Sequence, residues 1–201
     1  MNRKIHIQIL CEGQEEWHYI KRLLSFGLYN SDMYYFSEPI NVKTNSQLIN
    51  RFQIEYAKNK HDIILIFCDV DKDYKNFEGM VNALARNMEI DFAIAYKVFI
   101  FGNPVTLQIV LSHFDKVSLS HVAKAKNAIE VERLTGIENY SARENQIIEM
   151  MNRITYSSYE TLKENLKLIS IDYKDVPSTN FLVFLNNIES NDDSWAKELM
   201  F

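Results

Sequence analysis

The segment from Ile63 to Asp73 reads IILIFCDVDKD: six consecutive apolar residues, then acids at alternate positions. A continuous apolar run of this length is typical of a strand buried on both faces in a parallel sheet. Ligands of open α/β sheets bind beyond the carboxyl ends of the strands, where Asp69, Asp71 and Asp73 lie. Crowded carboxylates repel one another unless a cation neutralises them, which favours a Mg²⁺ site. The alternative is a cap at Asp69 followed by solvated turn residues.

The composition is that of an ordinary globular protein. With 201 residues and 47% hydrophobic content, the chain is long enough for one well-buried core, with or without a smaller lobe. No apolar run approaches the length that crosses a bilayer, so we expect a cytoplasmic protein without a membrane partner. Cys11 and Cys68 have no partners at metal-ligand spacing, and we expect them to be core residues. The net charge of −5 argues against wholesale nucleic-acid coating but allows a basic patch or metal-bridged phosphate contacts.

Strands and helices alternate through the first half of the chain. Isoleucines alternate with polar residues from Lys4 to Leu10, as in a strand, and a helix follows from Glu15. Such alternation predicts a Rossmann-like α/β core, with a mainly parallel sheet of four strands and right-handed crossovers. The further predicted elements are a short strand at Ile40 and Val42, a helix capped by Ser46, the central strand Ile63 to Cys68, a helix from about Asn76, a strand Tyr96 to Phe101 and a helix begun by Pro104.

Beyond about residue 115 the pattern predicts helices only. We therefore expect a core over residues 1–115 and a helical extension over residues 116–201 that packs on it. The basic residues of the extension are expected on ordinary solvated helix faces, and they include Lys116, Lys124, Lys126, Arg133, Arg143 and Arg153. The predicted helices are Ser120 to Leu134, closed by Gly136; one opened by the capping box Ser141-Ala-Arg-Glu144; Tyr159 to Leu168; and Asn180 to Ile188.

A second acidic turn, Cys11-Glu12-Gly13, ends the first predicted strand. The first and third strands of doubly wound sheets are often neighbours, which would place Glu12 roughly 5 Å from Asp69 and Asp71. Cys11 and Cys68 each directly precede the first acid of their turn, so the two turns occupy equivalent positions. Three or four carboxylates at one sheet edge would repel one another by several kcal/mol without a cation, which again favours metal.

These two turns resemble the TOPRIM module that topoisomerases, primases, recombination proteins and OLD-family nucleases share. The resemblance rests on Glu12-Gly13 after the first strand and on Asp69-Val-Asp71 after the third. Glu12-Gly-Gln-Glu-Glu16 is also similar to the EGxxE turn of OLD-like and RloB-like proteins. Two later segments resemble RloB-like proteins in particular, namely Asn103-Pro104 through His113-Phe114 and Pro177-Ser-Thr-Asn180.

RloB-like proteins are associated with phage-defence and restriction loci and are expected to be metal-dependent nucleases. The resemblance implies a hydrolase of phosphodiester bonds, dependent on Mg²⁺ or Mn²⁺, in a phage-defence or abortive-infection system. It implies DNA or RNA as partner, with a defence-system protein or a second copy of the chain as further candidates. Glu12 would be a ligand or general acid/base, Asp69 and Asp71 would be metal ligands, Glu16 would bind a second metal, and Asp73 would be an outer-shell acid.

The chain also departs from the family pattern. Leu107 and Ile109 stand where the family carries an acid and an aromatic residue, and Glu15 stands where a small residue is common. OLD nucleases use a lysine near the metals, for which Lys72 and Lys97 are the candidates here. These departures leave a second function open: a catalytically silent subunit that binds nucleic acid or a defence-system partner.

Two further classes of enzyme are weaker alternatives. In a glycosyltransferase, Asp69-Val-Asp71 would be a DxD motif that holds Mn²⁺ and a sugar diphosphate, but Glu12 would then have no role. In a haloacid-dehalogenase-type phosphatase, the nucleophilic Asp would follow the first strand, and Thr would stand where this chain has Asp73.

Overall fold

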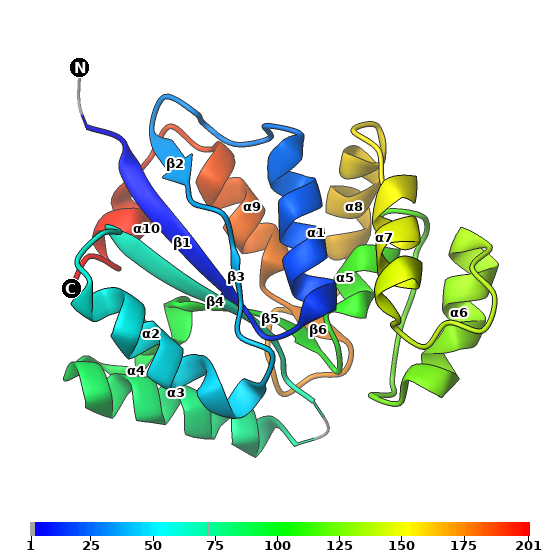
Figure 1. Ribbon diagram of the computed structural model, residues 1–201, viewed down its shortest axis with the longest axis horizontal. Coiled ribbons are helices and arrows are strands. Elements are labelled where there is room, and N and C mark those ends of the chain that lie inside the picture. The colour runs from blue at the N-terminus through cyan, green and yellow to red at the C-terminus, as the bar shows by residue number, and fades with distance from the viewer. Residues whose placement is uncertain (1–2, 72) are drawn as a thin grey trace.

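The computed structural model describes residues 3–71 and 73–201, and its centre is a mixed sheet with helices on both faces (Figure 1). Within the described residues the sheet has six strands in the order β2-β1-β4-β5-β6, and β3 also pairs with β1. The β5–β6 pairing is antiparallel and the others are parallel. The strands are β1 (Ile5–Cys11), β2 (Tyr34–Phe36), β3 (Ile40–Asn41), β4 (Ile63–Asp69), β5 (Phe99–Asn103) and β6 (Ser178–Thr179).

Helices cover both faces of the sheet. In Figure 1, α1 and α9 lie on one side, and α2, α3 and α4 lie on the other. In the part of the chain that is described, no helix is both long enough and apolar enough to span a membrane. The helices are α1 (Gln14–Ser25), α2 (Leu48–Ala57), α3 (Tyr74–Met88), α4 (Phe92–Lys97), α5 (Leu107–Leu111), α6 (Lys124–Thr135), α7 (Glu144–Arg153), α8 (Ser158–Leu166), α9 (Phe181–Glu189) and α10 (Ser194–Lys197), with a 3-10 turn at Asn45–Gln47.

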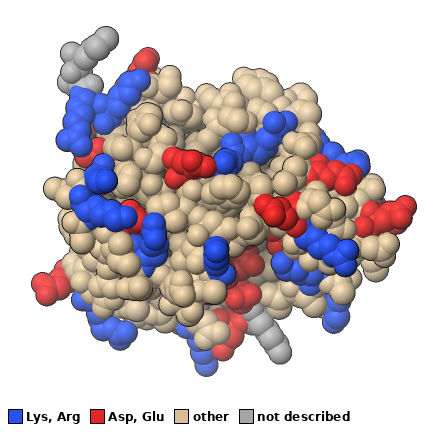
Figure 2. Space-filling view, in the orientation of Figure 1, with Lys and Arg blue, Asp and Glu red and all other residues tan. Residues whose placement is uncertain are grey.

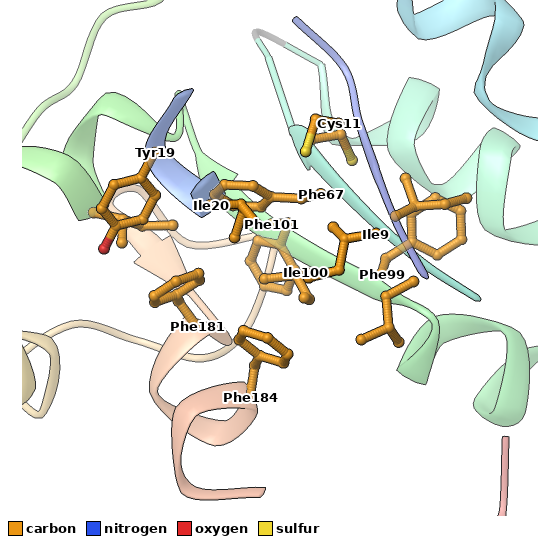
Figure 3. Close-up of a cluster of buried hydrophobic side chains, with 14 of the residues drawn as sticks. Ile9, Cys11, Tyr19, Ile20, Phe67, Phe99, Ile100, Phe101, Phe181 and Phe184 are labelled. Carbon is orange, nitrogen blue, oxygen red and sulfur yellow. The ribbon is translucent and has the colours of Figure 1, made fainter. Parts of the chain in front are cut away.

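The central strand β4 is buried as its apolar run predicts, and so are both cysteines. The predicted neighbourhood of the first and central strands is also confirmed, because β1 and β4 pair in parallel with Cys11 opposite Phe67. The core on the α1 side includes side chains from the end of the chain. Phe181 of α9 has its ring centroid 5.6 Å from those of both Phe67 and Tyr19 (Figure 3).

Three local predictions are wrong. Tyr96 belongs to α4, and the strand begins only at Phe99, because the apolar run through this region has no period that separates a helix from a strand. Pro104 does not open a helix, since α5 begins at Leu107. Ser141 does not cap α7 either: its backbone N–H and its hydroxyl both donate to Gln146 Oε1, and Arg143 is the N-cap residue.

The predicted count of four strands is too low, and the second half is not helical throughout. The sequence reading places a loop where β2 lies and only helices where β6 lies. Both strands are edge segments of three and two residues, too short to show a periodic pattern. Strand β6 and helix α9, which lie beyond residue 116, are thus part of the sheet and its cover.

The side chain of Asn180 continues the hydrogen bonding of β5 beyond β6. Its Oδ1 accepts from the backbone N–H of Phe101 at 3.0 Å, and its Nδ2 donates to the carbonyl of Phe99 at 2.7 Å. Both backbone groups belong to buried residues, and this amide gives each of them a hydrogen-bond partner at this edge of the sheet. Asn180 therefore fixes the start of α9 against the sheet.

We expect Asn180→Ala to lower the free energy of unfolding by about 2–3 kcal/mol, because it leaves a buried donor and a buried acceptor unpaired. Urea denaturation followed by circular dichroism measures the change. Asn186→Ala, at an exposed position of the same helix, is the matched control and should stay within about 0.5 kcal/mol of the wild type. Equal effects of the two substitutions would contradict this role of Asn180.

Candidate functional site

The two acidic turns meet at the carboxyl edge of the sheet. Because β1 and β4 are adjacent and parallel, their carboxyl ends lie side by side, and the Glu12 N–H donates to the carbonyl of Phe67 at 3.0 Å. The backbone N–H of Asp69 in turn donates to Glu12 Oε2 at 3.0 Å. The structure thus brings Glu12 and the end of β4 into direct contact, at the place where both turns predict a shared site.

Glu16, in the first turn of α1, is buried beside this pair. Its Oε2 accepts from the Gly13 N–H at 3.0 Å, and its Oε1 accepts from the Thr106 hydroxyl. The backbone N–H of Thr106 donates to Asp69 Oδ1 at 2.6 Å. A single residue after β5 therefore holds carboxylates from α1 and β4 in one place.

Thr106 is the functional residue that the sequence reading missed. It reaches the acids because the chain turns back tightly after β5: a Cβ on Gly102 would lie only 2.6 Å from Thr106 Cα. Glycine at position 102 is therefore required for this close approach. The available signal is that Thr106 follows the predicted strand Tyr96 to Phe101 by five residues and lies in the Asn103-Pro104 through His113-Phe114 segment already singled out.

Asp71 and Asp73 differ in their surroundings. Asp71 is half-buried, has φ +65°, and its N–H donates to the carbonyl of Pro104 at 3.1 Å. This bond ties its turn to the turn after β5. Asp73 is exposed, and its Oδ1 caps α3 by accepting from the Lys75 N–H at 3.0 Å. Asp71 thus stays beside the acidic cluster, whereas the carboxylate of Asp73 serves as a helix cap.

The remaining sequence candidates lie further out or elsewhere. Glu15 accepts from the Tyr140 hydroxyl at 2.6 Å and pairs with Lys124 at 3.2 Å. Lys97 pairs with Glu198 at the amino end of β5, the opposite edge of the sheet from the acids. The other lysine candidate, Lys72, lies outside the described residues. Leu107 and Ile109, the positions that depart from the family pattern, are buried apolar side chains of α5.

The acids raise one another's pKa values. Burial, and next the charge of Glu16, raise the pKa of Glu12 to about 7. Burial, and then the charges of Glu16 and Glu12, hold the pKa of Asp69 well above its usual range. Burial raises the pKa of Glu16 and Asp71 as well. Within residues 3–71 and 73–201, no lysine or arginine forms an ion pair with any of these four carboxylates, so a proton or another cation must balance them.

The donor set fits a hard divalent cation, since every side chain offers oxygen. Asp69 Oδ1 and Glu12 Oε2 each accept one backbone hydrogen bond, and both oxygens of Glu16 are already engaged. Among the described residues, no three His, Cys, Asp or Glu side chains converge as a ready-made ligand set. Mg²⁺ commonly takes one or two protein carboxylates and completes its shell with water and substrate phosphate. Asp69 and Asp71, with Glu12 alongside, would hold an ion in that way.

Comparisons of the chain with protein-family models, with curated proteins and with solved structures found no match. A mainly apolar cavity of about 430 Å³ lies against α9 and α10, away from the acids. Its lining includes Leu65, Tyr96, Ile100, Phe184 and Trp195 and none of the candidate acids.

The raised pKa of Glu12 predicts that stability falls as the pH rises. Below the ordinary value of 4.5, Glu12 is protonated in both the folded and the unfolded chain; between 4.5 and about 7 only the folded chain keeps the proton. The stability present at low pH is thus lost through this window, by on the order of 3 kcal/mol for Glu12. In EDTA, we expect the melting temperature to fall between pH 4.5 and pH 7.5, and to fall by roughly 10 °C more in the wild type than in Glu12→Gln.

Differential scanning calorimetry between pH 4.5 and pH 7.5 measures this difference. Glu132→Gln, which removes an exposed acid from α6, is the control and should follow the wild-type profile. Mg²⁺ or Mn²⁺ at the upper pH should restore stability to the wild type more than to Glu12→Gln, because the wild type has one more carboxylate in the cluster to neutralise. If the melting temperatures of the wild type and Glu12→Gln changed in parallel with pH, the raised pKa of Glu12 would be refuted.

Proposed function

We propose that the chain is a metal-dependent nuclease that hydrolyses phosphodiester bonds of DNA or RNA, using Mg²⁺ or Mn²⁺, in a phage-defence or abortive-infection system. The observation that carries the proposal is the direct contact between the Glu12 and Asp69 turns at one sheet edge, with Glu16 and Asp71 beside them and no basic partner among the described residues. The resemblance of the same turns to TOPRIM proteins of the RloB-like and OLD-like kind supplies the substrate class.

Each carboxylate has a distinct part in this reaction. A bound cation would neutralise the acids and the phosphate and polarise the bond to be broken. Glu12, with a pKa of about 7, is suited to accept a proton from water and to return it near neutral pH. Asp69 and Asp71 would hold the cation. Glu16 accepts hydrogen bonds on both oxygens, so we assign it a positioning role through Thr106 and Gly13 rather than direct ligation of a second ion.

A catalytically silent binding subunit is the second candidate. It is favoured by the missing ready-made ligand set in the described part of the chain and by the full hydrogen bonding of Glu16. A DxD glycosyltransferase is less well supported, because that function gives Glu12 no role, whereas the Asp69 N–H donates directly to Glu12. The two leading candidates differ in one measurable property, which is cleavage.

We expect the purified protein to cleave plasmid DNA, single-stranded DNA or RNA in Mn²⁺ and to be inactive in chelator. Asp69→Asn should lower the cleavage rate at least 100-fold, roughly the cost of removing a principal metal ligand. Asp73→Asn, which alters only the cap of α3, is the matched control and should retain the rate within about twofold. Gel analysis of products and circular dichroism of both variants complete the measurement.

Two outcomes would contradict the proposal that the chain is a nuclease. One is the absence of metal-dependent cleavage of all three substrates; the other is undiminished cleavage by Asp69→Asn. Salt-sensitive binding of nucleic acid without cleavage, unaffected by Glu12→Ala, would instead identify the binding subunit.

A further inference from the structure

A second cavity, of about 290 Å³, opens directly beside the acidic cluster. Asp71 forms part of its wall, so any ion held by Asp69 and Asp71 would lie at its edge. The rest of the wall comes from the turn after β5, the segment that leads into α6 and the loop before β6. The lining includes Asp71, Asn103, Pro104, His121, Lys126 and Val176.

The wall of this cavity combines one basic side chain with rigid polar and apolar surface. Lys126 is exposed, and within the described residues it has no acidic partner in ion-pair range. Asn103 is fixed by two hydrogen bonds of 2.7 Å from its Nδ2 to the carbonyls of Tyr173 and Asp175. Pro104 and Val176 supply apolar contact surface. A positive charge can balance the phosphate of a nucleotide, and a fixed amide and apolar walls can contact its base.

The charges around the cavity are arranged on two sides. Lys124 and Lys126 lie at the start of α6, where the helix dipole adds positive potential. Figure 2 shows basic side chains gathered at the lower right, where α6 begins, beside acidic side chains in the lower centre. Lys124 pairs with Glu15 at 3.2 Å, whereas Lys126 lines the cavity and forms no ion pair among the described residues. A phosphate in the cavity would therefore be balanced by Lys126 on one side and by a cation at Asp71 on the other.

We propose that this cavity holds one nucleotide of a single-stranded nucleic acid, with Lys126 on its phosphate. The inference depends on the proposed function, which it extends by naming the substrate class. At about 290 Å³ the cavity lies at the lower limit of small-ligand sites, which measure roughly 300–1,000 Å³, and this limits its occupant to a single nucleotide. A stacked duplex cannot enter a space of that size, whereas an unpaired nucleotide can. Single strands are accordingly the substrate, and a duplex binds only after it opens.

Binding can be tested separately from cleavage. Fluorescence anisotropy would follow a fluorescein-labelled DNA of ten thymidines, the matching RNA, and the same DNA in a duplex, with Ca²⁺ as a cation that supports binding. We expect the single strands to bind at least tenfold more tightly than the duplex. Lys126→Ala should weaken single-strand binding at least fivefold and reduce the dependence of log K on log salt by about 1.

Matched variants identify the contribution of the cavity itself. Lys60→Ala removes an exposed lysine from the opposite edge of the sheet and should leave binding unchanged, while Lys126→Arg should retain most of the affinity. Equal binding of duplex and single strand, no binding of either, or equal effects of Lys60→Ala and Lys126→Ala would each overturn the inference. Binding through Lys126 without Mn²⁺-dependent cleavage would refute the nuclease alone, and cleavage with unchanged binding in Lys126→Ala would refute the cavity alone.

Discussion

Carboxylates from the end of β1, from α1 and from β4 crowd one edge of the sheet without a basic partner among the described residues. The electrostatic repulsion among these carboxylates is the constraint on which the organisation of the site depends. Backbone and hydroxyl groups offset it only in part: the N–H groups of Gly13, Asp69 and Thr106 each donate to one acid. Hydrogen bonds to a carboxylate favour its charged form, whereas burial disfavours it more strongly here, since the pKa values of Glu12 and Asp69 are raised overall. The hydrogen bonds therefore do not fully stabilise the negative charge of the cluster, and a proton or another cation is needed to balance it.

The scaffold is built to keep these acids in place. Parallel pairing of β4 with both β1 and β5 brings three carboxyl ends to one edge, and the apolar side chains behind them are closely packed (Figure 3). Gly102 lets the turn after β5 approach closely enough for Thr106 to reach both Glu16 and Asp69. The end of the chain contributes as well, since β6 and Asn180 complete the far side of β5. Distant segments therefore cooperate in fixing the geometry of one cluster.

Sequence reasoning predicted the parts of this arrangement that depend on long-range regularities. The apolar run of β4 and the alternation in β1 identify buried parallel strands, and the contact between Glu12 and Asp69 follows from the pairing of these strands. The predicted equivalence of Cys11 and Cys68 is off by one residue, because Cys11 lies opposite Phe67. Thr106 was not predicted, because a hydroxyl that serves distant carboxylates leaves no periodic or charge signal in its own segment. The edge strands β2 and β6 were missed because so few residues show no pattern, and Tyr96 was misplaced because a continuous apolar run fits either element.

The two candidate functions correspond to two ways of balancing the negative charge of the acidic cluster, by a proton or by a divalent cation. A proton on Glu12 or Asp69 reduces the negative charge of the cluster, and in the binding-subunit proposal the site would act in this form, without a cation. In the nuclease proposal, a divalent cation would reduce this charge further and displace that proton, so metal affinity would rise with pH through the range in which Glu12 titrates. The hydrogen-bonded Glu16 and Thr106 keep the cluster assembled in either state. In the nuclease proposal, proton and cation would therefore compete for the same carboxylate oxygens, and a phosphate that brings its own cation would shift that competition toward the metal-bound form.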